Sequence, residues 1–271
     1  MAGTAKHPYH LVNPSPWPIL CSFALLALTV GGALALHGEA GGLELVFAAL
    51  AATAYVSYRW WRDVITEGIK DKAHTPEVSR GLRLGMVLFI TSEVMFFFAF
   101  FWAFFNGALM PKAPLTDVWA IAAGPWPPEG IYTFNPWDLP FMNTLILLLS
   151  GTTITWAHYA LVNGDMKGVK QGLWYTVILG FLFSCLQAYE YSHAAFGMDD
   201  TKYGAVFYLA TGFHGLHVII GTLFLAVMLR RAYTGTLTRE KHLGFEFAAW
   251  YWHFVDVVWL FLFVSIYWWG S

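Results

Sequence analysis

Seven long apolar stretches, separated by polar connections, restrict this 271-residue chain to a membrane-embedded fold. Each stretch can supply the roughly 20 helical residues that cross a hydrocarbon core about 30 Å thick. Only helices and closed barrels satisfy their own backbone hydrogen bonds in lipid, and these stretches are too long for barrel strands. The sequence therefore predicts an all-α polytopic membrane protein with seven transmembrane helices. We expect them at residues 17–36, 43–61, 82–110, 139–162, 172–191, 203–229 and 248–268.

Lysine and arginine are sorted into alternate connections. Thirteen of the fifteen lie in the N-terminal leader or near the connections that follow the second, fourth and sixth stretches. The remaining two, Lys112 and Lys202, lie in the connections that would face the opposite side of the membrane. Because inward-facing loops carry the excess of Lys and Arg, the N-terminus is predicted inside, in the cytoplasm or matrix, and the C-terminus outside.

The connections are too short for a soluble domain, so one membrane domain is expected over residues 1–271. Its predicted parts are an inner leader at 1–16, helices one and two within 17–62, an inner loop at 63–81, and helices three to seven within 82–271. The six-residue connection after the first helix makes the first two helices antiparallel neighbours. Thr75 precedes a proline and is therefore disfavoured in a helix.

Composition excludes several classes of function. The two cysteines, Cys21 and Cys185, lie in apolar stretches and indicate packing residues, with no disulfide or metal framework. Charged residues make up 12% of the chain, and no basic run is typical of nucleic-acid binding. The third stretch is aromatic on all sides, which predicts contact with lipid or with another apolar protein surface.

Ionisable residues at membrane depth are candidates for function, because burying them in lipid is costly. They are Glu93, Glu190, Asp256, His158, His193, His214, His217 and His253. Glu93 lies about 16 Å from the inner end of its helix at the helical rise. A role for Glu93 in lipid or proton handling is favoured over a purely structural one.

Two further patterns involve histidine. His214 and His217 are three residues apart and share a helix face, a spacing that could bind a metal or haem. The favoured interpretation is packing, with Gly212 and Gly215 indicating a close helix contact. Asp256 shares a face with His253, and we hypothesise a buried network that joins the sixth and seventh helices.

Several motifs in order resemble subunit III of the aa3-type cytochrome c oxidases, in the haem-copper oxidase family. The first group is Trp60-Trp61-Arg62-Asp63-Val64, His74-Thr75-Pro76, Gly81-Leu82-Arg83 and Ser92-Glu93-Val94. The second is Thr155-Trp156-Ala157-His158, Leu186-Gln187-Ala188-Tyr189-Glu190-Tyr191, Ala210-Thr211-Gly212-Phe213-His214-Gly215-Leu216-His217-Val218 and Trp250-Tyr251-Trp252-His253-Phe254-Val255-Asp256. The resemblance spans the whole chain.

This resemblance implies an oxidase subunit without redox centres. Haem a, haem a3 and copper would belong to partner subunits, with subunit I in direct contact and subunit II in the same complex. The subunit would stabilise subunit I and support proton uptake while oxygen is reduced to water and protons are pumped. It would lie in a bacterial cytoplasmic (inner) membrane, or in the mitochondrial inner membrane of a eukaryote.

The resemblance also implies that helices one and two splay from helices three to seven and form a cleft that holds phospholipids. Trp61 and Glu93 would line it. The lipid head groups would be approached by Glu67, His74 and Arg231. An inward-facing cation attracts an anionic head group, which fits this assignment.

Two leader histidines, His7 and His10, would collect protons on the inner surface, since histidine titrates near neutral pH. The alternative is that both are solvated residues of the leader.

Three other functions fit a seven-helix chain less well. A retinal protein needs a lysine in its last helix, and residues 248–268 contain none. A transporter favours broken helices with paired polar residues at the midplane. A redox enzyme needs a ligand set, whereas these histidines are scattered apart from one pair.

Overall fold

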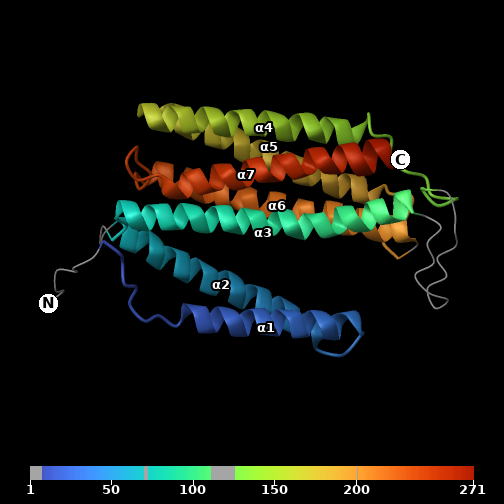
Figure 1. Ribbon diagram of the computed structural model, residues 1–271, viewed down its shortest axis with the longest axis horizontal. Coiled ribbons are helices and arrows are strands. Elements are labelled where there is room, and N and C mark those ends of the chain that lie inside the picture. Colours follow the sequence, from blue (N-terminus) through green and yellow to red (C-terminus); the bar gives the residue numbers. More distant parts are fainter. Residues whose placement is uncertain (1–7, 70–72, 111–125, 200) are drawn as a thin grey trace. The chain divides into compact units, whose positions relative to one another are not determined.

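The computed structural model describes residues 8–69, 73–110, 126–199 and 201–271, and its regular elements are helices (Figure 1). The prediction of an all-α protein is confirmed. The helices are α1 (Trp17–Leu36), α2 (Gly42–Ile69), α3 (Pro76–Leu109), α4 (Leu139–Asn163), α5 (Met166–Ser192), α6 (Lys202–Tyr233) and α7 (Leu243–Leu262), which continues as a π-helix (Phe263–Trp269).

Six of these helices are long and apolar enough to cross a membrane, among the residues described. They are α1, α3, α4, α5, α6 and α7 with its π-helical extension. Helix α2 has a lower mean hydropathy because Glu44 lies in its first turn and a charged segment begins at Arg59. The seventh crossing, the orientation and the lipid-holding cleft stay predictions.

The chain divides into two compact units, Met1–Leu82 and Arg83–Ser271, which we describe separately. The predicted single membrane domain stays a prediction. In the first unit, α1 and α2 form an antiparallel hairpin, as predicted. Gly42 packs directly on α1, and a Cβ there would lie 2.5 Å from the backbone nitrogen of Ala35. At the open end of the hairpin, the indole nitrogen of Trp17 donates to Asp63 Oδ2 over 2.7 Å.

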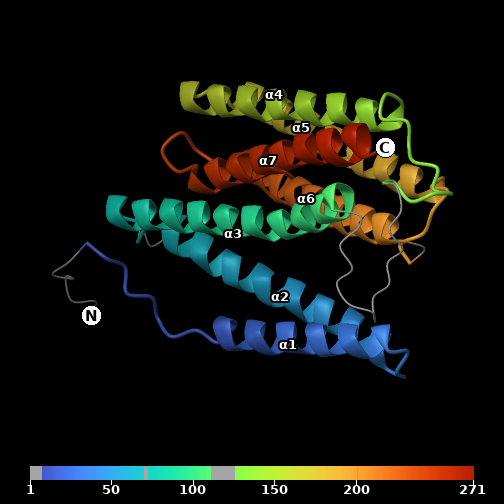
Figure 2. The ribbon, with the colours of Figure 1, turned by 45° about the vertical axis from the view of Figure 1, so that its right-hand side comes forward.

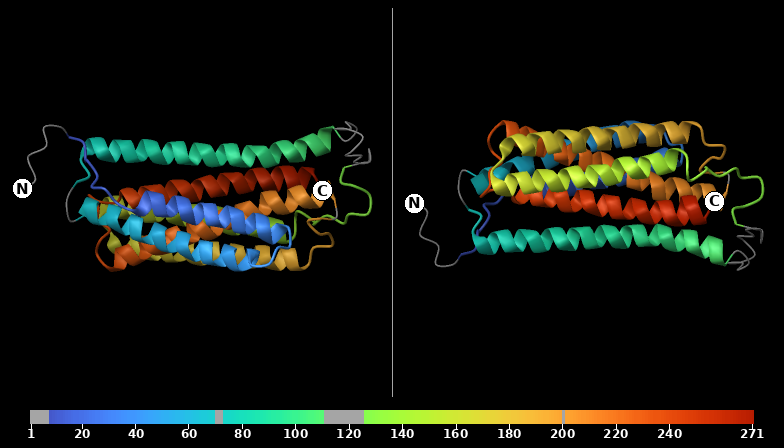
Figure 3. Two further views of the ribbon diagram at one scale, coloured as in Figure 1. Left: turned by 90° about the horizontal axis from the view of Figure 1, so that it is seen from below. Right: turned by 90° about the horizontal axis from the view of Figure 1, so that it is seen from above.

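In the second unit, α4 packs on α5 and α7, while α6 packs on α5 and α7 (Figure 2 and Figure 3). The core between these helices contains the fully buried rings of Phe183, Trp252 and Trp259. Helix α3 reaches this bundle through large side chains, including the ring pair Phe97–Phe254 with centroids 6.1 Å apart.

The helices extend further than the apolar stretches, and the inner loop at 63–81 stays a prediction, as a segment outside the membrane. Helix α2 continues to Ile69 and α3 begins at Pro76, because charged residues can extend a helix beyond the hydrocarbon core. Thr75 is outside the helix, as predicted, and its hydroxyl accepts from the backbone N–H of Val78 over 3.3 Å. Proline is favoured at the first helical position, where it has no N–H to leave unpaired.

Candidate functional site: polar groups on and between the helices

In the first unit, two of the predicted lipid-binding residues lie together at the C-terminal end of α2. The Ala73 N–H donates to the backbone oxygen of Glu67 over 3.0 Å. The neighbouring ring of His74 lies so close to Gly68 that an added Cβ would be 2.6 Å from its Nδ1. Trp61 lies earlier on the same helix with its side chain exposed.

The leader contacts the residue that precedes α3 through a hydrogen bond. The Thr75 hydroxyl donates to the carbonyl of Pro8 over 2.8 Å. His10, two residues further on, is half-buried. His7 lies outside the described residues.

In the second unit, the predicted residue Glu93 faces His217 across the α3–α6 interface. Its Oε2 lies 3.0 Å from His217 Nε2. The other ring nitrogen, Nδ1, lies 2.7 Å from the carbonyl oxygen of Phe213 and must donate to it, because a carbonyl only accepts. One proton is therefore shared between Nε2 and the carboxyl group. The sequence indicated both residues but not their pairing.

His214 and His217 share a face but contact different groups. Nε2 of the buried His214 donates to the carbonyl of Val255 on α7 over 3.2 Å. Within the described residues, no three His, Cys, Asp or Glu side chains gather as a metal site would require. Both imidazoles contact a neighbouring helix, His214 the backbone of α7 and His217 the Glu93 side chain of α3.

The predicted close contact at Gly215 is wrong, because an added Cβ would meet no described atom within 4 Å. Close packing on α6 occurs instead at Gly221, where a Cβ would lie 2.8 Å from the ring of Trp252. Trp252 lies on α7, and its bulk leaves no room for a side chain at position 221 of α6.

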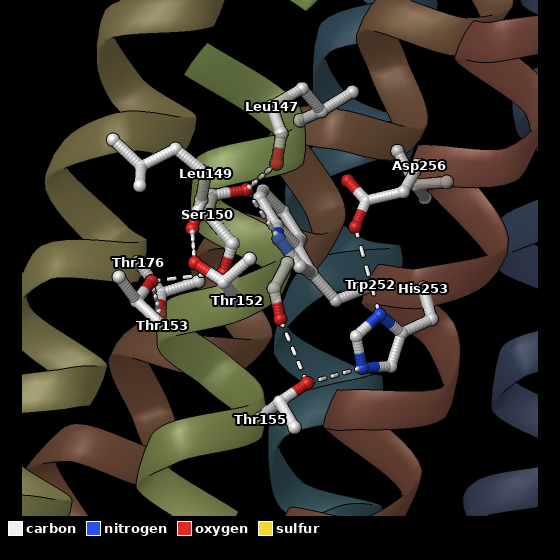
Figure 4. Close-up of polar contacts among 12 residues, drawn as sticks. Leu147, Leu149, Ser150, Thr152, Thr153, Thr155, Thr176, Trp252, His253 and Asp256 are labelled. Atoms are coloured by element: carbon white, nitrogen blue, oxygen red, sulfur yellow. Dashed lines mark hydrogen bonds and ion pairs between the residues drawn. The ribbon is translucent and has the colours of Figure 1, made fainter. Parts of the chain in front are cut away.

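Asp256 and His253 do form a network, but among the residues that the structure describes it joins α7 to α4 and not to α6 (Figure 4). Asp256 Oδ2 lies 3.7 Å from His253 Nδ1 and directly against Gly151. His253 Nε2 lies 3.3 Å from the hydroxyl of Thr155, which itself donates to the carbonyl of Gly151 over 2.9 Å. Since the Thr155 hydrogen is already used, Nε2 donates to that hydroxyl, and Nδ1 is the ring nitrogen that faces the Asp256 carboxyl group.

Hydroxyl groups of α4 accept hydrogen bonds from two buried tryptophans of α7. Trp252 Nε1 donates to Ser150 Oγ over 2.8 Å (Figure 4), and Trp259 Nε1 donates to Thr144 Oγ1 over 2.9 Å. Thr153 of the same helix bonds to Thr176 of α5 over 2.8 Å. The sequence analysis missed these pairs, because isolated serines and threonines in apolar stretches give no signal of their partners.

Glu190 lies at the C-terminal end of α5, buried beneath the π-helix. Tyr267 donates its hydroxyl hydrogen to Glu190 Oε1 over 2.6 Å, and Gln187 Nε2 donates to the same oxygen over 3.1 Å. Oε2 has no hydrogen-bond partner among the described residues. His193, which follows the helix, holds its Nδ1 3.0 Å from the Tyr189 carbonyl.

A charged cluster joins the beginning of α7 to α3. Arg83 donates to both carboxylate oxygens of Glu246, over 2.8 and 3.0 Å. His242 Nε2 lies 3.3 Å from the same carboxylate, and the ring of His158 lies 6.1 Å from that of His242. The predicted residue Arg231 lies apart from this ion pair and donates through Nη2 to the Thr236 carbonyl over 3.2 Å.

The comparisons with known proteins agree with one another. The family described as cytochrome c oxidase subunit III matches residues 7–271. A probable cytochrome c oxidase subunit 3 of Rickettsia bellii (strain RML369-C) is 56% identical over 270 residues, which cover 99% of this chain and 98% of the relative. A cytochrome c oxidase subunit 3 of Arabidopsis thaliana is 54% identical over 271 residues, the full length of both chains.

Proposed function

This chain belongs to the cytochrome c oxidase subunit III family, and we propose that it acts in that oxidase as a scaffold without redox centres of its own. The observation that carries the proposal is the similarity along residues 7–271. In this role the chain stabilises subunit I in a complex that also contains subunit II, while haem a, haem a3 and copper reside in those partners. The complex reduces oxygen to water and pumps protons.

The hydrogen bonding of the second unit supports a scaffold. Trp252 and Trp259 of α7 donate hydrogen bonds to hydroxyl groups of α4, and His214 of α6 donates one to the backbone of α7. These bonds use polar groups that would otherwise lie unpaired among apolar helices, where each costs about 1–3 kcal/mol. These bonds therefore specify how each of the helices α4, α6 and α7 is rotated against its neighbour.

Phospholipid binding is the second part of the proposal. The exposed side chain of Trp61 is suited to the interfacial region of a lipid. Glu67 and His74, which lie together at the C-terminal end of α2, would contact the lipid head group. Arg231 is a half-buried cation at the end of α6, and its positive charge would attract an anionic head group. Glu93, which carries a shared proton with His217, would face the acyl region.

Support for proton uptake is the third part. We assign it to His7 and His10 on the inner leader. The Thr75–Pro8 hydrogen bond supports this assignment, since it holds the segment between the two histidines against the residue that precedes α3.

The proposed setting is a bacterial inner membrane or a mitochondrial inner membrane, with the N-terminus inside and seven crossings. Helix α2 has 28 residues and so spans about 42 Å, enough for a crossing with a charged extension at its end. Relatives from Rickettsia and from Arabidopsis fit both membranes.

The proposal is tested by purifying the oxidase through an affinity tag on this chain. We expect haem a absorption and phospholipid in the eluate, both at a fixed ratio to the chain. The chain expressed without its partners should show no haem or copper absorption. A haem signal from the solitary chain, or no haem-bearing partner in the tagged eluate, contradicts the proposal.

A further inference from the structure

Four buried polar atoms on α4 and α5 have no hydrogen-bond partner among the described residues. They are Oε1 of Gln187, Oε2 of Glu190 and both amide atoms of Asn143. The three residues are between 0 and 4% exposed. Buried polar groups are costly to leave unpaired, and an ordered water or a bound ligand satisfies them where no protein group does. The four atoms therefore indicate a ligand inside the second unit.

Asn143 and Gln187 lie at the same level of the α4–α5 pair. The connection between these helices is only two residues long, so they run antiparallel. Their contact is marked by the hydroxyls of Thr153 and Thr176, which lie 2.8 Å apart. Asn143 is ten residues from Thr153, and Gln187 is eleven residues from Thr176 toward the same end of the pair. At the helical rise both amides are about 15–17 Å from the threonine contact.

Trp259 of α7 connects the two sides of this group. Its Nε1 donates to Thr144, the neighbour of Asn143 on α4. Its ring centroid lies 5.6 Å from that of Tyr267 in the π-helix, and Tyr267 donates to Glu190. The unpaired atoms of α4 and α5 therefore belong to one layer of the bundle, beneath a segment with π-helical turns. Such turns occur frequently at functional sites.

Glu190 needs a partner at Oε2 in either protonation state. Its Oε1 already accepts hydrogen bonds from Tyr267 and from Gln187 Nε2. If the carboxyl group is ionised, Oε2 is an acceptor without a donor. If it is protonated there, the hydrogen has no acceptor among the described residues. Water serves both states because it donates and accepts, whereas a cation serves only the ionised one.

We propose that Asn143, Gln187 and Glu190 form an internal binding site for one or two water molecules. The water donates to Gln187 Oε1, which can only accept, and bonds to Glu190 Oε2. It accepts from the Asn143 amide, whose N–H groups would repel a cation. Three hydrogen bonds of this kind are typical of buried water. The site links α5 to α4, and the inference is independent of the proposed function because it concerns the interior of one chain.

The first test is X-ray radiolysis of the intact oxidase followed by mass spectrometry. Hydroxyl radicals formed from bound water modify the side chains beside it, including buried ones. Tyr267 and Tyr251 are 1% and 4% exposed, and Tyr251 is the matched control. We expect Tyr267 to be modified several-fold faster than Tyr251, and Gln187→Met to remove the difference. Equally slow modification of both tyrosines in the wild type, or a fast rate that Gln187→Met leaves unchanged, overturns the inference.

The second test asks whether the two amides are coupled without a direct bond. Asn143→Leu and Gln187→Met each remove the polar atoms at similar side-chain size. We expect the double variant to lose about as much unfolding temperature as the worse single variant, because either substitution already disrupts the shared water. Gln171→Met replaces an exposed glutamine of α5, and its effect should add to that of Asn143→Leu. Additive losses for positions 143 and 187 overturn the inference.

The third test identifies the ligand. High-resolution density is compared for the oxidase prepared in sodium buffer and in choline buffer. We expect density within hydrogen-bond distance of Glu190 Oε2 and Gln187 Oε1 in both preparations. Density that is present only with sodium, or a protein side chain in that position, overturns the assignment to water.

Discussion

Glu93 Oε2 and His217 Nε2 lie 3.0 Å apart, although 124 residues separate the two side chains in sequence. Because His217 Nδ1 is bound to the Phe213 carbonyl, the ring cannot turn away without losing a hydrogen bond. The contact therefore specifies how α3 is rotated against α6, and it holds one proton between an acid and a base in apolar surroundings.

The first prediction concerns this pair. Glu93→Gln can keep a hydrogen bond by donating its amide N–H to His217 Nε2, whereas Glu93→Ala leaves that nitrogen unpaired. We expect Glu93→Ala to lower the free energy of unfolding by about 1–3 kcal/mol and Glu93→Gln by less. Thermal unfolding of the purified complex measures which of the two variants loses more stability. Equal losses for the two variants would contradict the hydrogen bond as the stabilising contact.

The second prediction compares two glycines of α6. Gly221→Ala places a Cβ 2.8 Å from the Trp252 ring and should destabilise the complex by about 1–3 kcal/mol. Gly215→Ala meets no described atom within 4 Å and should be neutral or stabilise the helix by up to about 1 kcal/mol. Unfolding temperatures of the two variants give the comparison. A destabilising Gly215→Ala would show that a partner covers this glycine in the complex.

The third prediction concerns the tryptophan bonds between α7 and α4. Trp259→Phe removes the donor to Thr144, whose hydroxyl still donates to the Pro140 carbonyl over 2.8 Å. The expected loss of stability is therefore about 1 kcal/mol, the net value of one hydrogen bond. Trp268→Phe is the control on the exposed side of the helix end and should change stability by less than about 0.5 kcal/mol.

A double-mutant cycle with Thr144→Val tests whether the bond itself is responsible. The two single losses should not add, because either substitution already removes the contact. Additive losses would assign the effect of Trp259→Phe to packing.

The fourth prediction separates two adjacent cations at the end of α6. Arg231→Ala removes a half-buried guanidinium, and Arg230→Ala removes the same charge from an exposed position. If Arg231 binds a phosphate, the first variant should lose about one phospholipid per complex in mass spectrometry, since a charge-assisted bidentate contact is lost. Arg230→Ala should keep the wild-type lipid content. The same loss from both variants would indicate a non-specific effect of charge.

The sequence predicted helices from the length of the apolar stretches, but it could not predict their ends. Hydropathy marks where a chain enters lipid, while the helices of α2 and α3 continue into charged segments up to Ile69 and back to Pro76. Transfer into hydrocarbon determines where the chain enters lipid, whereas backbone hydrogen bonding determines where a helix ends.

Single residues of the candidate site were easier to predict than their partners. Glu93 and Asp256 stand out because a carboxyl group is rare at membrane depth. Their partners depend on how each helix is rotated against its neighbours. Asp256 shares a face with His253, as its spacing indicated, yet that face meets Gly151 of α4. Spacing identifies a face of one helix and carries no information about which other helix lies against it.

The π-helix at the end of α7 also has a consequence for the angular order of its side chains. Eight residues along an α-helix bring a side chain roughly 80° away from its starting direction. The wider turns of Phe263–Trp269 absorb this drift, and Tyr267 lies beside Trp259 with ring centroids 5.6 Å apart. From there its hydroxyl reaches Glu190. Removing a single residue from this wide segment would swing the phenol out of the core and leave the carboxyl of α5 without its strongest donor.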